Sequence, residues 1–153
     1  MGTSFIINNN NSVGKTCGFL LPAFHGLLQN LEGRKRGPPG VLVLAPTREL
    51  ACQIEAECVK FGKSSNIRSV CVYGGSPKSQ QVRVIKGGIE VLIATPGRLN
   101  DLLDIKAVDL EHISFLGKIS TAAVTLYSHF FILFATFDAL SERGRKALPL
   151  LLL

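Results

Sequence analysis

Short apolar runs recur along the first 116 residues and are separated by polar and glycine-containing stretches. The runs at 41–45, 68–73 and 90–94 consist largely of Val, Leu, Ile and other β-prone residues. Continuous runs of this kind are typical of strands that are covered on both faces. The run at 113–116 begins a further strand, and the apolar residues at 4–7 also have strand character.

Between these runs, apolar residues recur every three or four positions, which is the spacing of a helix that buries one face. The pattern predicts helices at 17–28, with a kink at Pro22, and at 48–62, 77–84 and 98–104. Strands and helices therefore alternate. This alternation predicts an α/β fold, a parallel sheet with helices on both faces.

The length of 153 residues suits a single domain, and the net charge of +6 with an isoelectric point near 9.4 favours a polyanionic partner, either nucleic acid or nucleotide. Half of the excess positive charge comes from Arg34-Lys35-Arg36, which could equally be an exposed part of a loop without a binding role.

Four cysteines, at 17, 52, 58 and 71, form no zinc-spaced set, so we expect reduced, buried thiols. The amino terminus does not resemble a secretory signal, so we expect an intracellular protein, nuclear or cytoplasmic.

The tripeptide Gly14-Lys15-Thr16 lies between a predicted strand and a predicted helix. Backbone N–H groups and the helix dipole can hold phosphate oxygens there, Lys15 can reach the β- and γ-phosphates, and the Thr16 hydroxyl can bind Mg²⁺. Two positions depart from a strict phosphate loop, since Asn9 replaces the first glycine and Val13 is β-branched. The alternative to a phosphate-binding loop is an ordinary strand, turn and helix in which Gly-Lys-Thr occurs by chance.

Two further strand ends share one design, a hydroxyl followed by a helix start that carries an arginine. Thr47 is a plausible N-cap with Arg48 next to it, and Thr95 precedes Arg98 after a Pro-Gly turn. Glu49 suits the positive end of the helix or could tether one of the arginines. Ordinary capping explains Thr47 and Glu49 but does not require Arg48.

Gly74 and Gly75 would let another backbone approach closely. Three such loops on one sheet edge would form a track of hydroxyls, amides and guanidinium groups. A track of this kind suits a sugar–phosphate backbone that is contacted without reading bases.

The ordered set of motifs resembles the first RecA-like domain of a DEAD-box RNA helicase. The residues around the motifs are most similar to those of plant members of this family. Residues 14–22 are similar to the end of motif I and its helix, 45–51 to motif Ia, 74–75 to the GG motif and 94–99 to motif Ib. The resemblance covers about 5–116 and implies a RecA-like P-loop fold, ATP and Mg²⁺ as cofactors, and RNA as partner. It implies no membrane partner and leaves the oligomeric state open.

The resemblance assigns roles residue by residue. ATP phosphates would be bound by Ser12, Gly14, Lys15 and Thr16, with Thr16 also touching Mg²⁺. RNA would be bound by Pro46, Thr47, Arg48, Gly74, Gly75, Thr95, Pro96, Gly97 and Arg98, and Glu49 would be structural.

The chain departs from the family at two places. Motif I should read Ala-x-Thr-Gly-Ser-Gly-Lys-Thr, and residues 9–16 keep only its last three positions. After 113–116 the family continues into Asp-Glu-Ala-Asp, where an Asp organises Mg²⁺ and the Glu positions the attacking water. Here the sequence reads Gly117-Lys118-Ile119-Ser120. We therefore expect no catalytic residue in this chain.

These departures divide the chain into a partial RecA-like domain at 1–116 and an unrelated apolar tail at 117–153. The chain starts too late for the family's adenine-reading Q motif and contains no second RecA-like domain, so we expect a truncated gene product or a retained intron. We expect the uncharged segment 121–137 to aggregate or to pack as an irregular helix rather than to span a membrane. A non-catalytic RNA-binding module is the alternative to the helicase, and a different P-loop NTPase ranks last.

Overall fold

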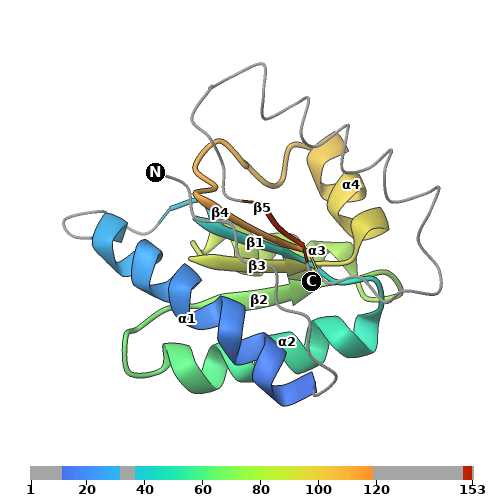
Figure 1. The fold of residues 1–153 in the computed structure, drawn as a ribbon. Coiled ribbons are helices and arrows are strands. Elements are labelled where there is room, and N and C mark those ends of the chain that lie inside the picture. Colours follow the sequence, from blue (N-terminus) through green and yellow to red (C-terminus); the bar gives the residue numbers. More distant parts are fainter. Residues whose placement is uncertain (1–11, 32–36, 119–149, 153) are drawn as a thin grey trace.

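The computed structural model describes residues 12–31, 37–118 and 150–152. Within these ranges the chain forms one five-stranded sheet flanked by helices (Figure 1). The predicted strand at 4–7 and the apolar segment at 121–137 lie outside the described residues.

The sheet is parallel throughout, with the strand order β2-β3-β1-β4-β5. The register is regular, since Leu44 of β1 lies opposite Ala94 of β3, which in turn lies opposite Val72 of β2. The strands are β1 (Val41–Leu44), β2 (Ser69–Val72), β3 (Val91–Ala94), β4 (Phe115–Lys118) and β5 (Leu150–Leu152).

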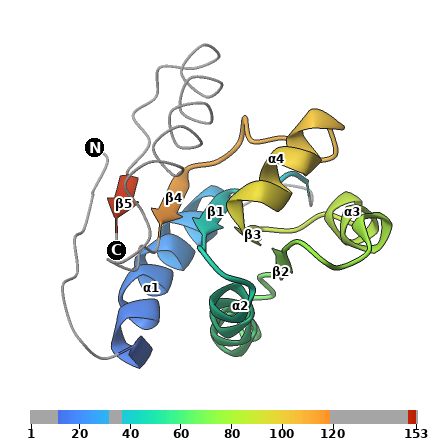
Figure 2. The ribbon, with the colours of Figure 1, turned by 90° about the vertical axis from the view of Figure 1, so that its right-hand side faces the viewer.

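Within the described residues, four helices cover the two faces of this sheet. Figure 2 shows α1 and α2 on one face and α3 and α4 on the other. The helices are α1 (Ser12–Leu31), α2 (Arg48–Gly62), α3 (Lys78–Lys86) and α4 (Pro96–Asp104). None of the helices in the described part of the chain is long and apolar enough to cross a bilayer.

The core consists of two layers because successive strand residues point to opposite faces. In β1, Val41 and Val43 join the layer beneath α1 and α2, whereas Leu42 and Leu44 join the layer beneath α3 and α4. All four side chains are at most 5% exposed. Such double-sided burial explains why the strands read as continuous apolar runs rather than alternating ones.

The predicted α/β fold is therefore confirmed. The helix at 48–62 has the predicted bounds, but α4 begins at Pro96, two residues before the predicted start, because proline fits the first turn of a helix. The helix α1 begins at Ser12 and continues through Pro22. The strand β4 extends past the expected domain boundary at 116, and Leu150–Leu152 pairs beside it.

Candidate functional site

Three loops of the predicted site meet at one edge of the sheet. They follow β1, β2 and β3, and the carboxyl ends of parallel strands lie at the same edge, where α/β folds bind ligands. The loops are tied to neighbouring strands, since Ala45 N–H donates to the Ala94 carbonyl at 3.0 Å and Thr95 N–H donates to the Val72 carbonyl at 3.0 Å. The structure thus brings 45–48, 73–76 and 95–98 together (Figure 2).

Two of the helices that begin at this edge, α2 and α4, each start after a threonine. The Thr47 side chain caps α2 by accepting a hydrogen bond from Leu50 N–H at 3.3 Å, which confirms the predicted N-cap. Thr95 occupies the same position before α4, yet within the described chain its hydroxyl makes no capping bond. The Thr95 hydroxyl and the first N–H groups of α4 are therefore available to an anion at the positive end of the helix.

Arg48 is exposed and lies against an aromatic ring of the neighbouring loop. Its guanidinium carbon is 4.6 Å from the centroid of the Tyr73 ring, a cation–π contact. The contact fixes the direction of the arginine at the start of α2 while it leaves the N–H donors at the edge of the guanidinium available. A planar guanidinium held in this way can bind a phosphate through two donors.

Arg98 lies differently, because its side chain is 9% exposed and points into the protein. Its Nη1 donates to the Ser76 carbonyl at 3.0 Å and to Gln81 Oε1 at 2.9 Å, and its Nε lies 3.5 Å from Asp101 Oδ2. Gln81 Nε2 in turn donates to the Tyr73 carbonyl at 3.2 Å. Arg98 therefore holds the 73–76 loop against α3 and α4, and a contact between Arg98 and RNA stays a prediction.

Gln81 and Asp101 were missed by sequence reasoning. Gln81 is 7% exposed and lies one turn before the buried Ile85 on α3, so it is a polar residue on the buried face of a helix. That position was the available signal, because buried polar groups require partners. Asp101 is exposed and also lies 3.6 Å from Lys78 Nζ. Glu49 is exposed, and within the described residues Arg98 pairs with Asp101 rather than with it.

The glycines of the site fall into two kinds. Gly75 has φ +82°, a left-handed conformation that favours glycine. Gly74 and Gly97 have ordinary backbone conformations, and a Cβ at either position would meet no described atom within 4 Å. Packing within the described chain therefore does not require these two glycines, and both leave open surface beside the site.

The Gly-Lys-Thr tripeptide lies in the first turns of α1, whose backbone is described from Ser12 onward. In Figure 1, α1 and α2 begin on the same side of the sheet. Residues 14–16, predicted to lie between a strand and a helix, are instead part of the helix, because α1 already begins at Ser12. The predicted phosphate-binding residues Ser12, Gly14, Lys15 and Thr16 thus lie at a helix start, where free N–H groups can hold an anion. Their side-chain roles, including the contact of Thr16 with Mg²⁺, stay predictions. Among the described residues, no three His, Cys, Asp or Glu side chains gather as a metal site.

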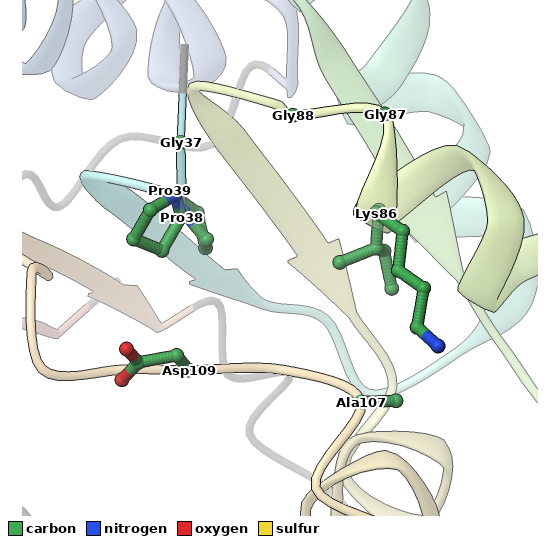
Figure 3. A pocket seen from close by; sticks show the side chains of 9 residues that line it. Gly37, Pro38, Pro39, Lys86, Gly87, Gly88, Ala107 and Asp109 are labelled. Atoms are coloured by element: carbon green, nitrogen blue, oxygen red, sulfur yellow. The ribbon is translucent and has the colours of Figure 1, made fainter. Parts of the chain in front are cut away.

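A pocket of about 310 Å³ opens at the opposite edge of the sheet, before the strands begin (Figure 3). Pro38 and Pro39 line it together with Lys86 and Asp109, which come from separate segments. None of the predicted site residues lies in this pocket. It is therefore distinct from the loop cluster at the carboxyl edge.

Comparison with known proteins identifies the family. A family model described as DEAD/DEAH box helicase matches residues 1–116, so the chain belongs to this family. The RNA helicase-like protein DB10 of Nicotiana sylvestris is 53% identical over 103 residues, covering 67% of this chain and 17% of that protein. The ATP-dependent RNA helicase DBP2 of Eremothecium gossypii is 56% identical over 104 residues, covering 67% and 18%. The chain thus spans less than a fifth of the length of these curated relatives.

Solved structures agree on the fold. The yeast DEAD-box splicing factor Prp28 matches with a TM-score of 0.79 at 24% identity, covering 97% of this chain and 35% of that one. A hypothetical ATP-dependent RNA helicase from Sulfolobus tokodaii matches with a TM-score of 0.73 at 20% identity, covering 97% and 40%. The RecA-like fold expected from the sequence is confirmed.

Proposed function

We propose that the carboxyl edge of this sheet binds the sugar–phosphate backbone of RNA, as part of the ATP-dependent RNA helicase activity of the family. The observation that supports it most is the convergence of three strand ends at one edge of the sheet. Two helix starts lie there, together with Arg48 stacked on Tyr73 and the Thr95 hydroxyl, which makes no capping bond within the described chain. These groups recognise phosphate and sugar rather than base edges. The relatives' printed names, which include RNA helicases, support the same partner.

The open space beside Gly74 and Gly97 supports a close approach of a ligand backbone. Glycine in the middle of a helix costs about 0.5–1 kcal/mol relative to alanine, which sets the upper limit for Gly97 in the first turn of α4. Since nothing within the described fold requires it, a bound strand is the simplest reason for glycine there. We propose that Pro46, Thr47, Arg48, Gly74, Gly75, Thr95 and Gly97 form the contact surface. Pro96 and Arg98 are buried, so we propose that Pro96 positions the start of α4 and that Arg98 positions the 73–76 loop.

Nucleotide binding is proposed at the start of α1. Gly14, Lys15 and Thr16 have the residue types that hold the phosphates of ATP and its Mg²⁺, and Ser12 precedes them at the helix start. Hydrolysis needs acidic residues that organise the metal and position water. At the position where the family places them, this sequence has Gly117-Lys118-Ile119-Ser120, so we propose that the chain does not turn over ATP by itself. An intracellular site of action, in the nucleus or the cytoplasm, follows from an RNA partner.

RNA binding is tested by fluorescence anisotropy of a labelled single-stranded RNA. We expect wild-type binding that weakens with salt, with a log–log slope that falls by about 0.7 when Arg48→Ala removes one phosphate contact. Lys60→Ala is the matched control, because it removes the same charge from the last turn of the same helix. Equal losses in both variants would indicate a general charge effect and contradict a specific site.

The alternative, a non-catalytic RNA-binding module, shares this surface and differs in nucleotide dependence. If ATP with Mg²⁺ changes RNA affinity and Lys15→Ala removes that change, the helicase-type coupling is supported. RNA binding that is indifferent to ATP favours the module.

A further inference from the structure

Cys52 and Cys71 come from different elements and lie in contact. Cys52 is half-buried in α2 and Cys71 is buried at the end of β2, and their sulfur atoms are 3.9 Å apart. The helix α2 packs on the β2 side of the sheet, so the pair joins the helix to the strand. Cys58 is completely buried nearly two turns further along α2 and offers an internal comparison.

The Glu55 carboxylate forms hydrogen bonds with Cys71, one of the two cysteines of this pair. Glu55 Oε2 accepts a hydrogen bond from Cys71 Sγ at 2.8 Å, and Glu55 Oε1 accepts one from the Cys71 N–H at 2.9 Å. The two bonds fix the carboxylate beside the sulfur. Burial and the bond to Glu55 raise the pKa of the Cys71 thiol, so this sulfur keeps its proton until a base removes it.

We propose that Cys52 and Cys71 form a peroxide-oxidised disulfide, with Glu55 as the proton acceptor of its closing step. The half-buried Cys52 is the sulfur that meets a peroxide, because Cys71 is only 9% exposed. Neither the phosphate-binding loops nor the RNA surface enters this proposal, so it stands apart from the proposed function.

The chemistry balances in two steps. First, Cys52 sulfur attacks hydrogen peroxide, the O–O bond breaks, an S–O bond forms, and the thiol proton leaves with the released hydroxide as water. Second, Cys71 sulfur attacks Cys52 sulfur while Glu55 takes the Cys71 proton. The S–S bond forms, the S–O bond breaks, and the leaving hydroxide receives that proton as a second water. Two thiols are oxidised and one peroxide is reduced.

The 3.9 Å contact must shorten to the roughly 2.05 Å of a disulfide. The full chain is treated with hydrogen peroxide, remaining thiols are blocked, and peptides are analysed by mass spectrometry without reduction. We expect a linked pair of peptides in which fragmentation assigns the bridge to Cys52 and Cys71. Cys58→Ala should keep this bridge, because Cys58 lies outside the pair.

The Glu55→Gln variant tests whether disulfide formation needs a proton acceptor or only the nearness of the two sulfur atoms. The amide keeps an oxygen that can accept from the Cys71 N–H, but it does not take up a proton. We expect closure at least about tenfold slower in this variant, with a sulfenic acid at Cys52 that a cyclic 1,3-dione traps. Closure at an unchanged rate in Glu55→Gln would overturn the role of Glu55. A Cys52 that is trapped as sulfenic acid in the wild type but never bridges to Cys71 would overturn the proposal as a whole. Cys52→Ser, at a half-exposed position, should abolish the bridge without a change in fold.

Discussion

The guanidinium of Arg98 donates to Gln81 Oε1 at 2.9 Å in the interior between α3 and α4. Through this bond and the bond from Gln81 Nε2 to the Tyr73 carbonyl, an arginine on one helix fixes the loop that follows β2. The loop carries Gly74 and Gly75 and supports Arg48 through the Tyr73 ring. One buried residue thus determines the shape of a surface to which it contributes little area.

Arg98→Ala should therefore destabilise the fold. The change leaves the Gln81 oxygen without its donor and frees the Ser76 carbonyl, so we expect a loss of about 2–3 kcal/mol in the free energy of unfolding, measured by urea titration. Lys78→Ala is the control, because its ion pair with Asp101 is exposed and contributes less than about 1 kcal/mol. A loss in Arg98→Ala no larger than that in the control would show that Arg98 does not hold the loop.

Gly75→Ala and Gly74→Ala should differ in stability although they are neighbours. Gly75 has φ +82°, so alanine there costs about 1–2 kcal/mol, whereas Gly74 has open space and an ordinary backbone, and alanine should change stability by less than about 0.5 kcal/mol. Thermal unfolding of both variants measures the difference. An equal loss in the two variants would show that the loop requires glycine at position 74 as well, which contradicts the expected difference.

The stability of the fold should fall in alkaline solution because of Cys58. Burial, reinforced by Glu55 and Glu57, raises the pKa of this thiol from 9.0 to about 12. Above pH 9 the unfolded chain loses the proton while the folded chain keeps it, so stability is complete below about pH 9 and declines towards pH 12. One group contributes a slope of about 1.4 kcal/mol per pH unit.

The check for Cys58 is urea unfolding from about pH 8 to about pH 11 in the wild type and in Cys58→Ala. The variant has no thiol at this position, so its stability should decline less steeply. Parallel curves would show that Cys58 ionises no later in the folded chain than in the unfolded one.

Lys15→Ala tests the proposed nucleotide site. A charge-assisted contact to phosphate is worth about 1.5–3 kcal/mol, so binding of a fluorescent ATP analogue should weaken about tenfold or more. Lys60→Ala should bind as the wild type does. With RNA present, phosphate release should stay at background in all three proteins; turnover that requires Lys15 would contradict the proposal that this chain is inactive alone.

The sequence predicts the strands, the helix α2 and the loop ends because these follow from local patterns. The Thr47 cap is confirmed, and the family predicted from the same motifs is confirmed. A close approach of another backbone at Gly74 and Gly75 stays a prediction. The burial of Arg98 could not be predicted in this way, since it depends on Gln81, 17 positions earlier on another helix. The contact between Cys52 and Cys71 is likewise tertiary, because it joins a helix to a strand with no metal-type spacing between the two cysteines.

Gly97→Ala tests the central proposal most directly, because stability and RNA binding should move in opposite directions. Alanine meets no described atom within 4 Å and favours the helix, so the free energy of unfolding should rise by up to about 1 kcal/mol. A methyl group at the start of α4 should at the same time obstruct the RNA backbone and weaken binding in the anisotropy titration. A Gly97→Ala chain that is at least as stable as the wild type and binds single-stranded RNA equally well would contradict an RNA site at this edge.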